Sequence, residues 1–193
     1  MINSKKELKE FLKYEQQLYG KKKINTWIPR FSEQGLIWKY IILLRKCEYL
    51  KNKKRKIAYS LSYYRFRSLG LKLGFNIPLN IVDKGLLIYH SGNLVINAKR
   101  IGRNFSVAGT AFLVAKGQTN ESPIIGDNVS IGMNVTIIGG VTVASMIAIG
   151  AGSVVTKSFL KENITIAGNP AKIINDNEGS SSWGGWTNHF GQH

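Results

Sequence analysis

The chain has 193 residues, enough for one domain with an appendage, and a formal net charge of +16 at pH 7. Its single cysteine, Cys47, excludes an intrachain disulfide and fits a reducing compartment, so we expect a cytoplasmic protein. The chain has no run of roughly 18 apolar residues, and its start, MINSKKELKE, lacks the apolar core of a signal peptide.

The positive charge is concentrated in the N-terminal third. Residues 1–75 contain 19 Lys or Arg and 5 Asp or Glu, whereas residues 76–193 contain 8 and 6. Such an excess is either a solvated surface or a contact for membrane headgroups or a polyanion. We favour peripheral contact with the inner membrane face over nucleic acid, because no nucleic-acid-binding motif accompanies the charge.

Three helices are predicted in this basic region, at 4–19, 33–52 and 54–69, with Ser4 and Ser32 as caps of the first two. Residues 27–29 are interpreted as a connector because they end in proline. The apolar stripe of the second helix comprises Leu36, Ile37, Tyr40, Ile41, Leu44 and Cys47. The third helix carries Ile57, Leu61 and Tyr64, with Tyr63 and Phe66 beside them. The aromatic residues of the third helix either pack between helices or contact the anionic partner.

A strict interval of six residues runs through residues 125–155. The recurring apolar residues are Ile125, Ile131, Ile137, Val143, Ile149 and Val155, with a second set at Val129, Val135, Val141 and Ile147. A period of six is neither helical nor that of a plain strand, and it is typical of a hexapeptide parallel β-helix. Small residues at Gly126, Gly132, Ala144 and Gly150 are expected to turn the corners, with positive φ where needed.

The repeat extends back to about residue 79, with Val95, Ile101, Val107 and Leu113 in register. Residues 114–123 turn polar and are predicted to leave the coil as a loop, a common location for functional residues. We expect a basic helical region at 1–75 and a mainly β, β-helical domain at 76–174. Residues 175–193 are expected to be a disordered tail or a segment added for expression.

His90 is the candidate catalytic residue, since the other two histidines lie in the tail. A neutral imidazole can act as a general base near pH 7, although a structural histidine is the alternative. Ala108 follows His90 by 18 residues, one predicted coil, so we expect the two to stack on one face beneath the loop at 114–123. One histidine cannot supply a metal site, so no metal is expected.

Four segments carry a resemblance to a known family: GLLIYHSGNLVINAKRIGRN, PIIGDNVSIGMNVTIIGG, AIGAGSVVTKS and AGNPAKI. They resemble the serine acetyltransferase-like branch of the hexapeptide acyltransferases, and within it the sub-branch found with surface-polysaccharide biosynthesis. The resemblance covers about residues 70–174. It implies a left-handed β-helix, a homotrimer with active sites between neighbouring prisms, and acetyl-CoA as co-substrate.

The same resemblance implies residue roles. His90 would take the proton of an acceptor hydroxyl, and backbone N–H groups near Ala115 would face the oxyanion. Gly132 and Ala151 would leave room for the pantetheine arm, while Lys157 and Lys172 would meet the phosphates of CoA.

Three positions on the acceptor side depart from serine acetyltransferases, and a fourth departs from the polysaccharide sub-branch. Tyr89 stands where they have an aspartate, and Asn76 is the best match to a second aspartate that orients the imidazole. Glu121 replaces an arginine that reads the serine carboxylate, so it would repel L-serine. Ala108 fills a slot that often holds histidine in the polysaccharide sub-branch.

These observations lead to three hypotheses. The first is an acetyl-CoA-dependent O-acetyltransferase that acts on a sugar hydroxyl, such as a nucleotide-linked or lipid-linked glycan precursor. The second is a serine O-acetyltransferase of cysteine biosynthesis. The third is a catalytically silent trimeric scaffold that docks on membranes through residues 1–72. The sequence leaves open whether two trimers pair into a hexamer.

Overall fold

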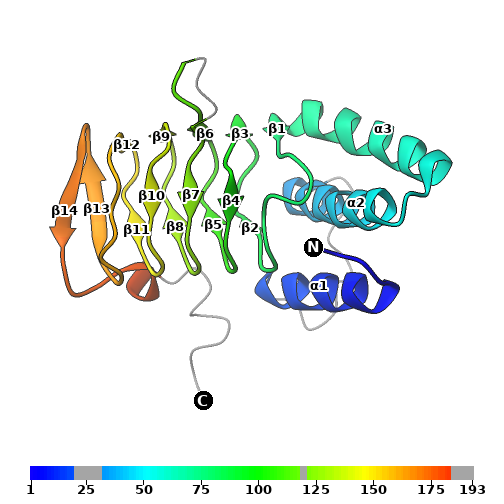
Figure 1. Cartoon of the computed structure of the whole chain (residues 1–193), viewed down its shortest axis with the longest axis horizontal. Coiled ribbons are helices and arrows are strands. Elements are labelled where there is room, and N and C mark those ends of the chain that lie inside the picture. Colours follow the sequence, from blue (N-terminus) through cyan, green and yellow to red (C-terminus); the bar gives the residue numbers. More distant parts are fainter. Residues whose placement is uncertain (20–31, 118–120, 184–193) are drawn as a thin grey trace.

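The computed structural model describes residues 1–19, 32–117 and 121–183. Three helices lie at one end of a prism of short strands (Figure 1). They are α1 (Lys5–Leu18), α2 (Glu33–Asn52) and α3 (Lys56–Leu73). The predicted connector at 27–29 lies outside the described residues.

Three sheets form the faces of the prism. The first face contains β1 (Phe75–Asn76), β3 (Leu94–Ile96), β6 (Ala111–Val114), β9 (Val135–Ile138) and β12 (Val154–Val155). The second contains β4 (Arg100–Ile101), β7 (Ile124–Ile125) and β10 (Thr142–Val143). The third contains β2 (Leu87–Ile88), β5 (Ser106–Val107), β8 (Ser130–Ile131), β11 (Ala148–Ile149), β13 (Thr165–Gly168) and β14 (Ala171–Asn175). Neighbouring coils pair in parallel, and the antiparallel pair β13–β14 closes the far end, so the predicted parallel β-helix is confirmed.

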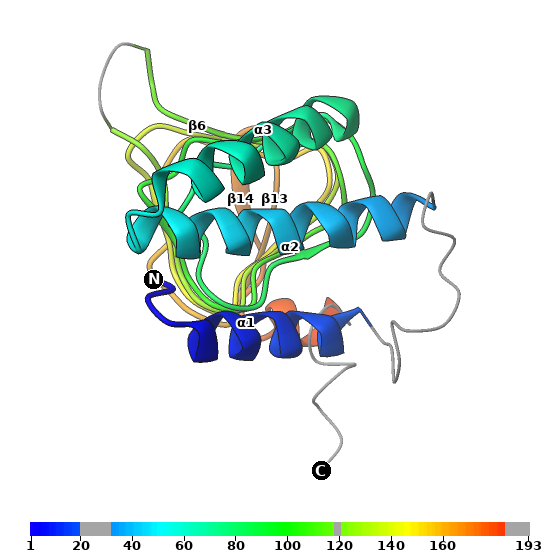
Figure 2. The same cartoon turned by 90° about the vertical axis from the view of Figure 1, so that its right-hand side faces the viewer.

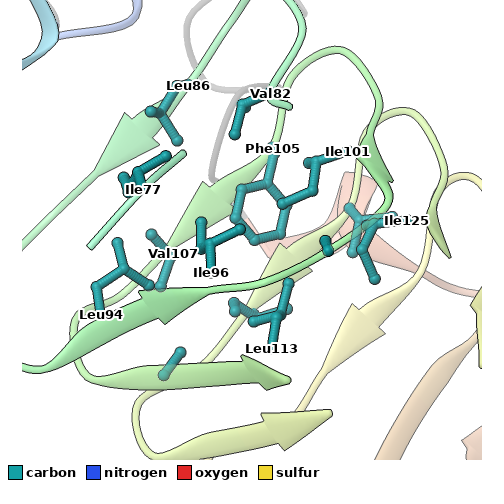
Figure 3. Close-up of a cluster of buried hydrophobic side chains, with 14 of the residues drawn as sticks. Ile77, Val82, Leu86, Leu94, Ile96, Ile101, Phe105, Val107, Leu113 and Ile125 are labelled. Atoms are coloured by element: carbon teal, nitrogen blue, oxygen red, sulfur yellow. The ribbon is translucent and has the colours of Figure 1, made fainter. Parts of the chain in front are cut away.

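The residues that recur every six positions fill the interior of the prism. Each of Ile125, Ile131, Ile137, Val143, Ile149 and Val155 is buried. Figure 3 shows Ile101, Val107, Leu113 and Ile125 within one such cluster. Burial of an aliphatic side chain contributes about 1.5–3 kcal/mol, so this stack is a main source of stability. Val95 was wrongly assigned to the core: Leu94 and Ile96 are buried instead, because β3 is displaced by one residue from the six-residue register.

The small residues at the corners serve close packing between coils. An ideal Cβ on Gly126 would lie 2.6 Å from the backbone nitrogen of Ser145, and one on Gly132 would lie 2.6 Å from that of Ala151. The expectation of positive φ at these glycines is wrong. Left-handed backbone occurs instead at a separate set of corner residues: Asn104, Asn128, Asn134 and Met146. Asparagine tolerates this conformation better than most side chains do.

The predicted excursion from the coil is present between β6 and β7 (Figure 1). Successive coils are 18 residues apart where Ser130 pairs with Ala148, but 24 apart where Ser106 pairs with Ser130. The loop adds the extra residues without disturbing the stacking of the strands. Residues 118–120 at its centre lie outside the described part of the chain.

The three helices begin and pack largely as their sequence indicates. Ser4 accepts a hydrogen bond from the Glu7 N–H (3.0 Å), and Ser32 accepts one from the Gly35 N–H (3.1 Å), so both predicted caps are confirmed. The predicted stripe of α2 is buried except for the half-buried Leu36.

The predicted inner face of α3 is wrong. Ile57, Leu61 and Tyr64 are exposed, and the buried side of the helix carries Ser62, Phe66, Leu69, Gly70 and Leu73. Phe66 stacks on Tyr40 of α2 with 4.8 Å between ring centroids. The sequence placed Phe66 only beside the expected stripe, because α3 is apolar on two sides and the pattern alone does not decide which side is buried.

The helices cover the open end of the prism (Figure 2). Arg45 of α2 is fully buried and bonds Glu15 of α1 (2.6 Å) and Glu48 of α2 (3.0 Å). It also donates to the carbonyl oxygens of Val82 and Asp83 in the first coil, both at 2.8 Å. The network therefore ties two helices to the prism and satisfies backbone groups at its edge.

The described C-terminal segment packs back on the prism. Thr165 donates to the carbonyl oxygen of Glu178 (2.6 Å), and Ser180 is buried with its hydroxyl against the carbonyl oxygen of Asn128. The structure thus places residues 176–183 against the β-helix, unlike the expected disordered tail, and residues 184–193 lie outside the described part. Among the described helices, none has the length and apolarity needed to cross a membrane.

Candidate active site

Several of the predicted site residues lie along one edge of the prism. In the third face, Ile88 pairs with Val107, Val107 with Ile131, and Ile131 with Ile149. The residues that follow these partners turn the corner toward the first face. They form two adjacent columns, Tyr89–Ala108–Gly132–Gly150 and His90–Gly109–Met133–Ala151.

The expected stacking of His90 on Ala108 is wrong by one residue. Ile88 in the first coil pairs with Val107 in the second, 19 positions later. Ala108 is therefore level with Tyr89, and Gly109 is level with His90. An ideal Cβ on Gly109 would lie 3.6 Å from the Cβ of His90.

The corner at His90 has five residues (89–93) in the first coil but three (108–110) in the next. The next stretch is one residue shorter, because Ile101 follows Ile96 by five residues, whereas the equivalent Val143 follows Ile137 by six. The net displacement is one residue. His90 therefore sits on an enlarged corner.

Glu33 fixes this corner. It is the first residue of α2, and its Oε1 accepts hydrogen bonds from the backbone N–H and the hydroxyl of Ser91, both at 2.7 Å. Its Oε2 faces Nδ1 of His90 at 3.5 Å. The neighbouring Gln34 donates to the carbonyl oxygen of Tyr89 (3.3 Å). The start of α2 thus holds the backbone on both sides of the imidazole.

The carboxylate at this position is ionised near neutral pH. The pKa of Glu33 lies below its ordinary value of 4.5, chiefly because the Ser91 N–H and hydroxyl donate to the charged form, with a smaller contribution from His90. The positive end of the α2 dipole favours the same charge state. An anionic Glu33 favours the tautomer of His90 that carries its proton on Nδ1, which leaves Nε2 as an acceptor.

Neither Asn76 nor Tyr89 supplies the carboxylate-like partner of the imidazole. Asn76 lies on β1 and accepts a hydrogen bond from Arg67 (3.0 Å). Tyr89 is part of the same corner as His90, and burial raises the pKa of its hydroxyl. Sequence reasoning missed Glu33, because its position after the cap Ser32 has the simpler interpretation of a favourable first-turn charge.

The loop residues occupy a different edge. An ideal Cβ on Gly139 would lie 3.4 Å from the Cβ of Lys116, and one on Gly140 would lie 3.1 Å from the Cβ of Glu121. Both ends of the excursion therefore rest on the corner between the first and second faces, and Ala115 lies beside them. His90 is on the corner between the third and first faces, so the expectation that the loop covers His90 of the same chain is wrong.

The predicted phosphate-binding lysines come together at the closed end of the prism. Lys157 and Lys172 line one surface pocket of about 380 Å³ with Lys161. Lys172 pairs with Ala167 across β13–β14, and Ala167 continues the column of Gly132 and Gly150. The small-residue edge thus leads from the corner of His90 towards this pocket. Within the described residues, no group of His, Cys, Asp and Glu could hold a metal ion.

Comparisons with known proteins find relatives named serine acetyltransferase. Serine acetyltransferase of Buchnera aphidicola subsp. Schizaphis graminum is 33% identical over 138 residues, which cover 67% of this chain and 50% of that protein. The chain is serine acetyltransferase-like in its sequence. No protein-family model matches it. The chain spans about half the length of the Buchnera relatives that it matches.

Solved serine acetyltransferases share the fold. The enzyme from Brucella abortus strain S19 has a TM-score of 0.70 at 24% identity, over 90% of this chain and 71% of that one. Its complex with coenzyme A has a TM-score of 0.67 at 23% identity, over 90% and 70%. The soybean enzyme complexed with serine has a TM-score of 0.68 at 22% identity, over 86% and 69%. The β-helix of this chain is therefore the left-handed one of these serine acetyltransferases.

Proposed function

We propose that the chain is an acetyl-CoA-dependent O-acetyltransferase with His90 as its general base. The observation that carries the proposal is the single prism edge that runs from the corner of His90, past Gly132 and Ala151, towards the lysine pocket. The relatives and structural neighbours named serine acetyltransferase support the same activity, and one of those structures contains coenzyme A.

The residues along this edge fit coenzyme A. Ala151 is small and exposed, so an extended arm can lie close to the backbone there. Gly132 lets the coil of Ala151 pack closely, because a Cβ on Gly132 would lie 2.6 Å from the backbone nitrogen of Ala151. Lys157 and Lys172 supply positive charge for phosphates at the closed end. When bound, acetyl-CoA supplies the acetyl group as an activated thioester.

His90 carries out the proton transfer. An acceptor hydroxyl is a weak nucleophile until a base takes its proton in the transition state. Nε2 of His90 accepts that proton as the acceptor oxygen attacks the thioester carbonyl, while Nδ1 faces Glu33, whose negative charge stabilises the imidazolium that forms. When the C–S bond breaks, the acetyl group stays on the acceptor oxygen, and the proton passes from Nε2 to the leaving CoA thiolate. The clamp on Ser91 keeps the ring in place for this step.

A second copy of the chain completes the site in this proposal. Ala115 and Glu121 lie on a different edge from His90, so one chain alone does not bring them to the imidazole. In a homotrimer of parallel prisms, the loop edge of one copy faces the His90 edge of the next. Backbone N–H groups near Ala115 would then face the developing oxyanion.

L-Serine is the first candidate acceptor, because the relatives and structural neighbours are named as serine acetyltransferases and the soybean structure contains serine. A sugar hydroxyl is the second candidate. Glu121 favours it, since an exposed carboxylate on the loop repels the carboxylate of serine but accepts hydrogen bonds from sugar hydroxyls.

The acceptor test is thiol release from acetyl-CoA by the full-length chain, with L-serine and with nucleotide sugars compared in parallel. Saturable turnover with serine supports the first acceptor, and turnover only with sugars supports the second. A Glu121→Arg variant sharpens the comparison, because reversal of this charge raises activity towards serine if Glu121 faces the acceptor. Absence of turnover and of saturable acetyl-CoA binding would favour a silent scaffold.

A further inference from the structure

We propose that the outer face of α3 and the groove between α2 and α3 form a docking site for an anionic phospholipid bilayer. The proposal goes beyond acetyl transfer and is independent of it. The residues involved lie at the helical end of the prism, whereas the candidate active site follows an edge of the coils (Figure 1).

The outer face of α3 is an exposed apolar stripe. Ile57 is 90% exposed, Leu71 is 77% exposed, and Leu61 and Tyr64 between them are also exposed. Their spacing places them on one side of the helix. The opposite side already packs on α2 through Phe66 and its neighbours. The stripe therefore has no role in the core, and contiguous exposed apolar surface of this kind marks an interaction site.

Positive charge surrounds this stripe. Residues 51–75 contain eight Lys or Arg and no Asp or Glu. Lys51, Lys53, Lys54, Arg55 and Lys56 precede or begin α3, while Arg65, Arg67 and Lys72 lie within it. An apolar stripe bordered by cations is the pattern of a helix that lies in a membrane interface and is attracted to anionic lipids.

A groove continues the stripe. It has a volume of about 470 Å³ and runs between α2 and α3, with apolar contacts from Leu43 and Leu69. Three cations, Lys39, Arg65 and Lys72, also line it. Tyr64 belongs to both the stripe and the groove. Apolar walls beside three cations suit the phosphate and adjoining glycerol of a lipid headgroup.

Two other occupants are less favoured by these residues. A symmetric contact between two copies would bring the same cations against one another, with no acidic residue of α3 to offset them. Single-stranded nucleic acid needs free aromatic faces for stacking. Tyr59 and Tyr63 stack on each other instead, with 5.3 Å between centroids, and Tyr63 also contacts Phe66.

The test is co-sedimentation of the full-length chain with vesicles. One set contains phosphatidylcholine alone, and the other contains equal parts of phosphatidylcholine and phosphatidylglycerol. We expect binding only to the anionic set. Replacement of Lys39, Arg65 and Lys72 by Gln should weaken binding at least about tenfold, because each cation near the surface contributes to the attraction. Leu61→Ser with Tyr64→Ser should weaken it by a similar factor through loss of apolar insertion.

The matched control removes the same charge elsewhere. Lys5, Lys6 and Lys9 are exposed on α1, and their replacement by Gln should change binding by less than about twofold. Circular dichroism verifies that every variant is folded. Equal losses in the control and groove variants would overturn the proposal in favour of general charge attraction. Failure to bind anionic vesicles, or tighter binding of single-stranded RNA than of vesicles, would also overturn it.

Discussion

Glu33 accepts two hydrogen bonds of 2.7 Å from Ser91, one from its backbone N–H and one from its hydroxyl. The two residues are 58 positions apart in the sequence, and their contact joins the start of α2 to the corner that presents His90. The helical region therefore does more than cover the end of the prism. It also positions the proposed catalytic base.

Glu33→Gln should lower kcat by about tenfold or more with little change in KM, because displacement of a catalytic group by ~1 Å can cost about 100-fold. Glu7→Gln, at the first turn of α1, is the matched control and should leave both quantities unchanged. Equal effects of the two substitutions would contradict a positioning role.

The same carboxylate makes stability depend on pH. Because folding lowers the pKa of Glu33 from 4.5, its contribution is fully present above that value and is lost as pH falls through the lower, folded-state pKa. The difference in unfolding free energy between the wild type and Glu33→Gln should therefore be constant near neutral pH and shrink below about pH 4.5. Denaturant titrations across this range measure it, and a difference that grew on acidification would refute the assignment.

Ala151→Trp should raise the KM for acetyl-CoA at least about tenfold, because an indole on the small-residue edge blocks the path beside His90. The protein should remain folded, since Ala151 is exposed. Arg103→Trp places the same side chain at an exposed position on the edge between the second and third faces and should leave the KM unchanged. An unchanged KM for acetyl-CoA in Ala151→Trp would show that the co-substrate does not bind along this edge.

Arg45→Met should destabilise the chain by about 3–5 kcal/mol, because it leaves the carboxylates of Glu15 and Glu48 buried without their cation. Arg103→Met breaks an exposed ion pair with Asp127 and should cost less than about 1 kcal/mol. Urea denaturation of both variants checks the contrast. A similar loss of unfolding free energy in the two variants would mean that the Arg45 network does not stabilise the packing of the helices on the prism.

The interior could be predicted from the sequence because the six-residue period reports burial directly. Ile125 through Val155 obey it without interruption, and their burial follows. The family resemblance placed Gly132 and Ala151 beside the co-substrate, and the strand register puts them on the edge that carries His90. The six-residue period failed by one residue at Ala108, since the corner at 89–93 has two extra residues and the stretch from Ile96 to Ile101 has one fewer, and neither change is visible in the aliphatic pattern.

Contacts between distant segments were not predictable in this way. Glu33 meets Ser91 only because α2 packs across the end of the prism, and no local pattern encodes that contact. The inner face of α3 was misassigned for a related reason. Ile57 and Phe66 lie on stripes of similar hydrophobicity, so the packing partner decides which one is buried.

Thiol release from acetyl-CoA by His90→Ala tests the role of His90 as general base most directly. Cys47 does not contribute to the thiol signal of the folded protein, because it is buried and burial raises the pKa of its thiol to about 12. With the acceptor that the wild type turns over, we expect kcat to fall by about 100-fold or more. Acetyl-CoA binding and the oligomeric state should stay unchanged. Turnover near the wild-type rate in His90→Ala would show that His90 is not the base.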